Sequence, residues 1–170
     1  MKHAGLNLLI KSEAAYVAGF TDGDGYIGIS RFIEKKNLSG YSYRAEFKLD
    51  SVSKEFLKSL RKLTKDGSYL ERAGNSKWNE REMNHLVLTV SGIKRILPKI
   101  IPHLKLKKRQ AILTLKFANL CRQGERRNPQ IAEKLYWQVK YLNRRGRDAL
   151  CSKAQYIKTH SASRQWLELL

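Results

Sequence analysis

The stretch AAYVAGFTDGDGYIGIS, residues 14–30, contains the change of pattern that decides the fold. Up to Asp22 the apolar residues recur with helical spacing, whereas from Tyr26 onward they alternate, as in a strand with one buried face. Asp22 and Asp24 lie at this junction among glycines. Acidic residues at such a junction either form a turn or hold a metal ion, so the rest of the chain must distinguish the two.

The chain of 170 residues is strongly basic, with a formal net charge of +19. Its length suits one compact domain, and 42% hydrophobic residues can form a core without disulfides. Cys121 and Cys151 lack the spacing of a zinc site, and no apolar run has the length of a membrane span or signal-peptide core. These features predict an intracellular protein of the cytoplasm or an organelle matrix, neither secreted nor bound to a membrane. The charge favours nucleic acid as the partner and identifies no activity.

Two successive runs of one helix and two strands predict an α+β fold. The expected elements are a helix over residues 13–22 with Ser12 as its cap, strands from residue 26 and over 41–50, a helix over 53–63, a hairpin within 66–90, and helices over 93–101, 105–121 and 131–142. Two hairpins would build a four-stranded antiparallel sheet with helices on one face. We expect a core domain over residues 1–145 and a C-terminal tail with a short helix over 146–170.

Alternation divides the side chains of the first hairpin between two faces. The residues expected to point inward are Ile27, Ile29, Ile33, Tyr41, Tyr43, Ala45, Phe47 and Leu49. Those expected on the other face include Ser30, Phe32, Ser42, Arg44, Glu46 and Lys48. A solvated face would have a similar composition. The positive charge, the mixture of hydrogen-bond donors and acceptors, and the fit of strands into the major groove favour contact with DNA.

A row of small residues runs along the first helix at a spacing of four, formed by Ala15, Gly19 and Gly23. Small side chains at this spacing let a second backbone approach unusually closely. A helix that merely frays at its glycines is the alternative interpretation.

The segment YVAGFTDGDGYI, residues 16–27, resembles the signature of the LAGLIDADG homing endonucleases. A second segment, LPKIIPHLKLKKRQA (97–111), resembles the stretch ahead of the fourth helix in that family, and the αββαββα order fits both positions. The resemblance covers about residues 12 to 142. Because only one copy of the signature is present, the chain resembles the homodimeric branch of the family rather than its two-motif monomers.

The resemblance implies a site-specific endonuclease that cuts double-stranded DNA at a long pseudo-palindromic site, with a curved sheet as the DNA-binding saddle. Asp24 and the backbone carbonyl of Gly23 would bind Mg²⁺; Mn²⁺ could replace it, and Ca²⁺ would support binding without cleavage. Lys107 would belong to the water network around the scissile phosphate. Further polar groups would come from Asp50 or Ser51 and from Lys54, whereas Asp22 would be a structural group at the helix end.

The alternation of the strands and the small-residue row predict two surfaces. The expected DNA contacts are Ser30, Phe32, Ser42, Arg44, Glu46, Lys48, Tyr69, Arg72, Lys107 and Lys108. The expected dimer interface consists of Ala15, Gly19, Phe20, Asp22 and Gly23. Each subunit would read a half-site of roughly ten base pairs, because a strand of that length spans about one helical turn. No membrane and no other protein partner is expected.

The acidic junction has other interpretations. A calcium-binding EF-loop is excluded, because DGDGYI lacks a third carboxylate and has Ile27 where that loop requires glycine. A relative that binds without cutting, such as an intron-splicing maturase or a DNA-binding regulator, would keep the fold and the charge. Intact Asp24 favours the enzyme, and cutting of duplex DNA in Mg²⁺ would separate the two.

Overall fold

The structure is a computed structural model, and it describes residues 9–35, 40–72, 83–120 and 129–143. The elements are α1 (Lys11–Asp24), β1 (Gly25–Ile33), β2 (Tyr41–Ser51), α2 (Lys54–Thr64), β3 (Ser68–Arg72), β4 (Met83–Val87), α3 (Val90–Ile100), α4 (Lys108–Asn119) and α5 (Pro129–Leu142). The α+β fold class is therefore confirmed. The expected tail over 146–170 lies outside the described residues.

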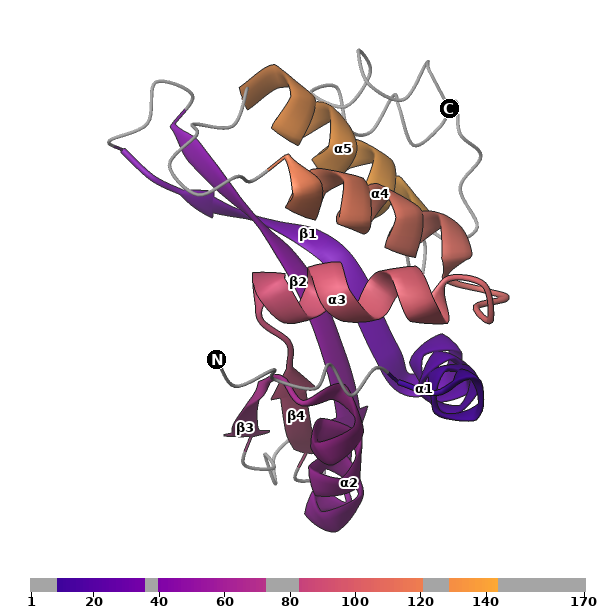
Figure 1. The fold of residues 1–170 in the computed structure, drawn as a ribbon. Helices are drawn as coiled ribbons and strands as arrows, with labels where there is room; N and C mark the ends of the chain where they lie inside the picture. The colour runs from indigo at the N-terminus through magenta and orange to yellow at the C-terminus, as the bar shows by residue number, and fades with distance from the viewer. Residues whose placement is uncertain (1–8, 36–39, 73–82, 121–128, 144–170) are drawn as a thin grey trace, which may run out of the picture.

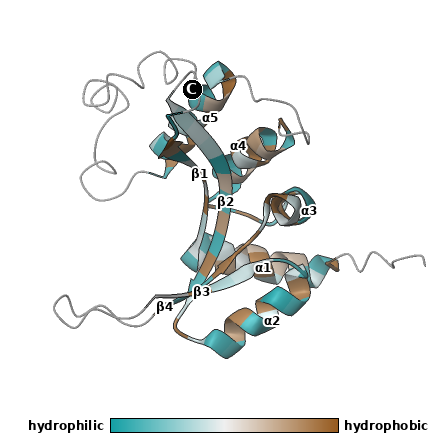
Figure 2. Cartoon of the chain, turned by 90° about the vertical axis from the view of Figure 1, so that its left-hand side faces the viewer, coloured by the Kyte–Doolittle hydropathy of each residue, from teal (hydrophilic) through white to brown (hydrophobic). Residues whose placement is uncertain are grey.

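The four described strands form one antiparallel sheet in the order β1-β2-β4-β3. All the helices of the described part lie on one face of this sheet (Figure 1), and the strands curve so that the other face is concave (Figure 2). The core lies between the sheet and the helices, where Phe47, Leu49 and Leu86 meet Ile93 and Phe117. The uncovered face is thus the surface that remains for a partner.

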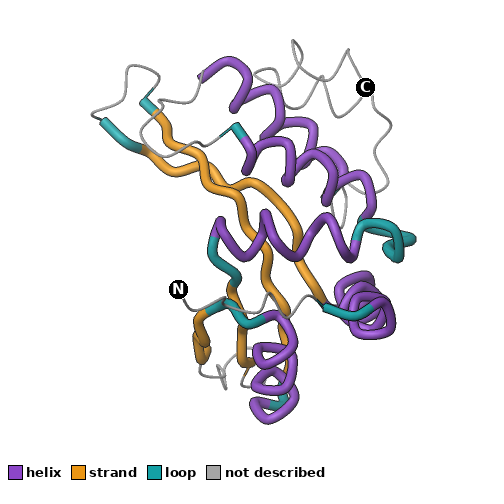
Figure 3. Tube along the Cα trace, viewed as in Figure 1, coloured by secondary structure: helices purple, strands orange, loops and turns teal. Residues whose placement is uncertain are grey.

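The strands β1 and β2 form a long hairpin that extends well past β3 and β4 (Figure 3). Ala45, Phe47 and Leu49 are buried as predicted, but Ile33 is 81% exposed. The inward prediction for Ile33 is wrong because this residue pairs with the exposed Tyr41 at the far end of the hairpin. Alternation gives the face of a residue and does not show how far along a strand the helices reach.

Two helix boundaries differ from the sequence prediction. Ser12 lies inside α1 rather than at its cap, and the Glu13 carboxylate instead accepts a hydrogen bond from the N–H of Ile10 at 2.9 Å. α3 begins at Val90 rather than at residue 93, and Pro98 lies inside its last turns. Ser53 does cap α2, because its hydroxyl accepts from the N–H of Phe56. No helix of the described ranges is both long and apolar enough to cross a membrane.

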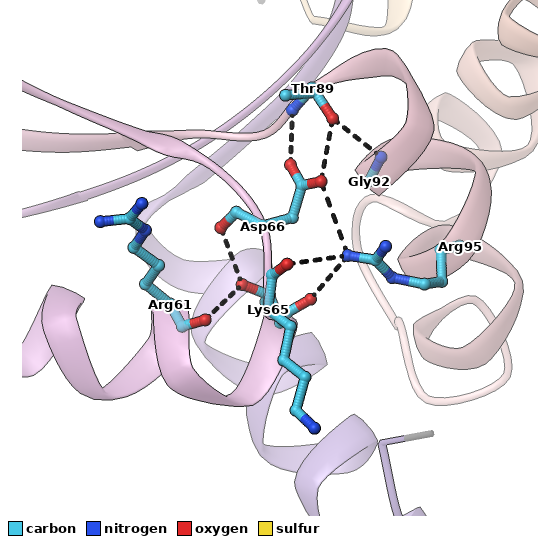
Figure 4. A network of polar contacts seen from close by, with 7 residues as sticks. Arg61, Lys65, Asp66, Thr89, Gly92 and Arg95 are labelled. Carbon is cyan, nitrogen blue, oxygen red and sulfur yellow. Dashed lines mark hydrogen bonds and ion pairs between the residues drawn. The ribbon is translucent and has the colours of Figure 1, made fainter. Parts of the chain in front are cut away.

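A polar network fixes the turn between α2 and β3 to the beginning of α3 (Figure 4). The Asp66 carboxylate accepts hydrogen bonds from the N–H of Thr89 at 2.8 Å and from its hydroxyl at 2.9 Å. Arg95 donates to the carbonyls of Thr64 and Lys65 at 3.0 and 3.2 Å. Gly92 gives this contact its room, because a Cβ there would lie 2.3 Å from the carboxyl carbon of Asp66. The network therefore fixes the β3–β4 hairpin relative to α2 and α3.

The far half of the long hairpin is attached to α5 through Arg31. This residue lies on the helix-covered side of β1, and its guanidinium carbon is 4.4 Å from the ring centroid of Tyr41, 5.1 Å from that of Tyr136 and 5.4 Å from that of Trp137. A guanidinium stacked on aromatic rings combines cation–π attraction with apolar packing. This basic strand residue therefore holds the hairpin and does not face a partner across the sheet.

Candidate active site and nucleic-acid interface

The carboxylate of Asp22 holds the segment that leads into α4. It accepts hydrogen bonds from the N–H of Lys105 at 2.6 Å and from the N–H of Lys107 at 2.9 Å. Burial raises the pKa of this carboxyl, but the backbone donors of residues 105–107 outweigh burial and leave its pKa below the usual value. An anion is also favourable here, because Lys107 is the N-cap of α4 and helix N-termini carry positive partial charge.

Lys107 makes the reciprocal contact with the end of α1. Its ammonium donates to four backbone carbonyls, those of Thr21 (2.7 Å), Asp22 (3.0 Å), Gly23 (3.3 Å) and Gly25 (2.7 Å). The last carbonyls of a helix lack intrahelical partners and form its negative end. A cation at this place satisfies them. Asp22 and Lys107 therefore clamp the end of α1 to the beginning of α4.

Asp24 is the last residue of α1 and is exposed at this clamped end, as is Gly23. Within the described ranges, no group of three or more His, Cys, Asp or Glu side chains could hold a metal ion. One carboxylate and one carbonyl suit a hard cation that keeps several waters and takes substrate phosphate oxygens. The Gly23 carbonyl has the longest of the four Lys107 contacts and two lone pairs, so it can serve a cation as well. These donors fit the implied metal.

Ser51 and Lys54 lie at the same end of the sheet as Asp24. The register pairs Gly25, the residue after Asp24, with Leu49, and Ser51 follows two residues later. The Ser51 hydroxyl accepts from the N–H of Ser53 at 3.1 Å, and Lys54 begins α2. The structure thus brings both sequence-predicted residues to the edge where α1 meets the sheet, with Ser51 engaged in the turn between β2 and α2.

The predicted contacts on the long hairpin share the uncovered face. Ser30 pairs with Arg44 and Phe32 with Ser42, and these positions alternate with the buried Ala45 and Phe47. The guanidinium of Arg44 lies 5.4 Å from the ring centroid of Phe32. Lys48 forms an ion pair with Glu46 at 2.9 Å. Lys108 is exposed at the first residue of α4. The hairpin therefore presents a cationic and hydrogen-bonding surface away from the core.

Tyr69 is a correction to this set. It pairs with Leu86, which in turn pairs with Leu49, so it lies on the core side of the sheet. Its hydroxyl is buried with no hydrogen-bond partner in the described part of the chain, and the Arg61 guanidinium of α2 lies 5.3 Å from its ring. A five-residue strand gave too short an alternation to set its phase. Arg72 pairs with Met83 in the same register, and its side chain lies outside the described part.

A model of the LAGLIDADG endonuclease family matches residues 17–122, which is well over half of the chain. The chain belongs to the LAGLIDADG endonuclease family. Among solved structures, it resembles the homing endonuclease I-CvuI in complex with its target, at 22% identity, over 81% of this chain and 85% of that one, with a TM-score of 0.67. It also resembles the archaeal intron-encoded homing endonuclease I-Vdi141I complexed with DNA, at 17% identity, over 91% and 96% of the two chains, also with a TM-score of 0.67. These likenesses show a common fold, and a search of curated proteins finds no match.

The small-residue row of the LAGLIDADG segment is open. Ala15, Gly19 and Gly23 are exposed, and a Cβ built on either glycine would meet no atom within 4 Å in its own chain. Phe20, by contrast, is half-buried, with its ring centroid 4.8 Å from that of Phe56 in α2. Of the predicted interface, the row itself is therefore the part that a second subunit can reach without repacking the fold.

Sequence reasoning about this LAGLIDADG chain missed His85 on the uncovered face. His85 pairs with Asp50 across β4 and β2, and its Nδ1 lies 2.7 Å from Asp50 Oδ1. Leu86 and Leu88 are buried, so alternation around them could have placed His85 outward. No sequence signal links His85 to Asp50, because the pairing of β2 with β4 depends on the register between the two hairpins.

The clamp predicts a pH-dependent loss of stability for Asp22→Asn. The free energy of unfolding of the variant should be lower by about 1 to 2 kcal/mol at neutral pH, because charge-assisted hydrogen bonds are replaced by weaker ones. DNA cutting should be retained. The folded pKa of Asp22 lies below its unfolded value, so its stabilisation is present above the unfolded pKa and is lost as the pH falls through the folded pKa. Urea unfolding at neutral and acidic pH would measure this. A difference between wild type and variant that is equally large in acid would contradict the clamp.

Proposed function

We propose that the protein is a site-specific endonuclease that cleaves both strands of double-stranded DNA at a pseudo-palindromic site, as a homodimer that uses a divalent metal. The observation that carries this proposal is the exposed Asp24 at the end of α1, next to a concave sheet face with Arg44 and Lys48 on it. I-CvuI has been captured with its target DNA in Ca²⁺, and with another target, uncleaved, in Mg²⁺. Those structures support the proposal that this chain, too, acts on double-stranded DNA with a divalent metal ion.

The residues of this chain would each take one part of the reaction. Asp24 and the Gly23 carbonyl would hold the metal, which when bound activates a water and neutralises the scissile phosphate. Lys107 binds the carbonyls at the end of α1, so the carboxylate of Asp24 is held in one place before DNA arrives. Lys107 also keeps a positive charge beside the reacting phosphate, as electrostatic stabilisation of the transition state requires. Because one subunit offers one such carboxylate, two subunits would supply the pair.

The size of the sheet supports a half-site of roughly ten base pairs. β1 has 9 residues and β2 has 11, and strands rise about 3.3 Å per residue, so the hairpin spans about one turn of B-DNA. Two subunits joined through α1 would place the two Asp24 residues near the two-fold axis and one hairpin in each half-site. A footprint that covers one turn in total would contradict this arrangement.

Cleavage is the property that separates this proposal from a binding-only relative. We expect purified protein to cut a subset of a random duplex library in Mg²⁺ or Mn²⁺, and to bind the same subset without cutting in Ca²⁺. Mg²⁺ matches a site with few carboxylates because it retains waters. Protein that shifts duplex DNA but never cuts it, across the library and in either metal, would favour the maturase or regulator alternative.

Arg44 should read a base. Replacement by Ala is expected to relax the preference at one symmetrically related position in each half-site by about 1–3 kcal/mol, because a lost bidentate contact to guanine costs this much discrimination. Lys108→Ala is the matched control, since an exposed lysine at the beginning of α4 should lower affinity for all sequences alike. Sequencing of the sites bound by each variant measures both effects. An unchanged preference at every position in Arg44→Ala would refute the assignment.

A further inference from the structure

Three side chains form a row across the uncovered face, one from each of three neighbouring strands. Asp50 of β2 pairs with His85 of β4, which pairs with Leu70 of β3. The row alternates with the buried Leu49 and Leu86, so it points away from the helices. Leu70 is 55% exposed, and the side chains of His85 and Asp50 are 22% and 35% exposed. A polar pair and an apolar side chain are therefore available together on the concave surface.

The row lies at the end of the sheet where Asp24 is held. Gly25 pairs with Leu49, and the two strands are antiparallel, so the step back from Gly25 to Asp24 corresponds to the step forward from Leu49 to Asp50. Arg44 lies six residues from Asp50 along β2, about 20 Å away at the rise of a strand. A DNA half-site on this face would meet the row close to the cleaved phosphate and would meet Arg44 well away from it.

The contact between Asp50 and His85 fixes the hydrogen-bonding character of the row. An ionised carboxylate only accepts, so the 2.7 Å contact places a proton on Nδ1 of the imidazole. Neither Nε2 nor the second carboxylate oxygen has a hydrogen-bond partner among the residues that the structure describes. The row thus presents a carboxylate acceptor beside the imidazole and the apolar Leu70.

We propose that this row determines the base preference at the inner end of each half-site, by selecting an amino-bearing base and rejecting guanine. Adenine N6 and cytosine N4 are the donors of the major groove, whereas the groove edge of guanine has two acceptors, N7 and O6. Leu70 adds an apolar contact that suits a thymine methyl group, which favours an adenine–thymine pair. This inference rests on the proposed function and adds to it the source of discrimination next to the cleavage site.

A cross-strand pair that only stabilises the sheet is the competing explanation. Opposed polar pairs of this kind stabilise sheets in many proteins, and such a role predicts a lower melting temperature without any change of base preference. Asp50→Asn separates the two explanations, because it keeps the shape and the hydrogen bond from Nδ1 but adds an amide donor to the row. An amide donor gives guanine a partner where the carboxylate gave none.

The test is selection of sites from a randomised duplex library by wild type, Asp50→Asn, His85→Ala and the control His103→Ala, with melting temperatures of all four. His103 lies in the turn between α3 and α4, away from the sheet. Wild type and control should reject guanine at one inner position of each half-site, and both row variants should relax this rejection by roughly 10-fold or more. Preferences at the outer positions should stay unchanged.

Two outcomes would overturn the inference. One is an unchanged base profile in Asp50→Asn, whatever its melting temperature. The other is a loss that is equal for every sequence, which would assign the row to affinity or to the chemical step. Selection is performed twice, by binding in Ca²⁺ and by cutting in Mg²⁺. If the protein never cuts, the bound sites still report the base preference, so failure of the proposed function and failure of this inference give different results.

Discussion

Asp24→Asn should abolish DNA cleavage while leaving DNA binding intact. The amide keeps nearly the same shape but removes the charge that would hold the cation, so the activated water and the neutralisation of the phosphate are lost together. Asp24 is exposed, so the fold should not depend on its charge. Affinity for DNA should be equal or higher, because a carboxylate that faces phosphate without a metal repels it.

Nicking and binding by Asp24→Asn are measured on one duplex in Mg²⁺ and in Ca²⁺. Asp22→Asn is the matched control, with the same substitution two residues away on a carboxylate that is engaged with the backbone of residues 105 and 107. The control should cut below its lowered melting temperature. Robust cutting by Asp24→Asn would show that Asp24 does not hold the metal. A loss of cutting confined to Asp22→Asn would assign that role to Asp22 instead.

Gly19→Leu should convert the proposed homodimer into a folded monomer. Nothing in the same chain lies within 4 Å of a Cβ at this position, so a single subunit tolerates the leucine. The substitution even favours the helix, because glycine costs about 1 kcal/mol relative to good helix formers. In a dimer joined through α1, the same side chain would force the two backbones apart. Double-strand cleavage should fall roughly 100-fold or more, since simultaneous engagement of both half-sites is lost.

Sedimentation velocity measures the mass of this variant, and a nicking assay measures the remaining activity. Ser59→Leu is the matched control, because it puts the same side chain on an exposed position of a different helix, α2. The control should remain a dimer and cut normally. A Gly19→Leu protein that sediments as wild type does would show that α1 is not the interface.

The sequence predicted the helices, the strands and their buried faces well, because each of these predictions depended on local periodicity. Alternation placed Ala45, Phe47 and Leu49 correctly, and Ser53 gave the beginning of α2. Tyr69 was assigned to the wrong face because β3 has only five residues, and its phase depends on β4. Local patterns determine which residues form a strand, whereas the partner strand determines where that strand lies in the sheet.

The sequence predicted which residues form the candidate site, but it predicted few of the contacts between them. Asp24, Gly23 and Lys107 were identified from the signature and from the segment at 97–111, but nothing in the sequence shows that the Lys107 ammonium would lie on four carbonyls at the end of α1. More than eighty residues separate the two ends of that contact. The pair of Asp50 and His85 was missed for the same reason, since 35 residues separate them.

The stacking of Arg31 on Tyr41, Tyr136 and Trp137 matters for any attempt to change the DNA sequence that this protein recognises. A mutant library that varies every charged position of the hairpin would include Arg31, although this side chain lies on the opposite side of the sheet from Arg44. Members of the library that lose Arg31 would lose its contacts with Tyr136 and Trp137 of α5, and the resulting loss of stability would be mistaken for a loss of DNA recognition. The productive positions for randomisation on the hairpin are Ser30, Phe32, Ser42 and Arg44, with Arg31 held constant.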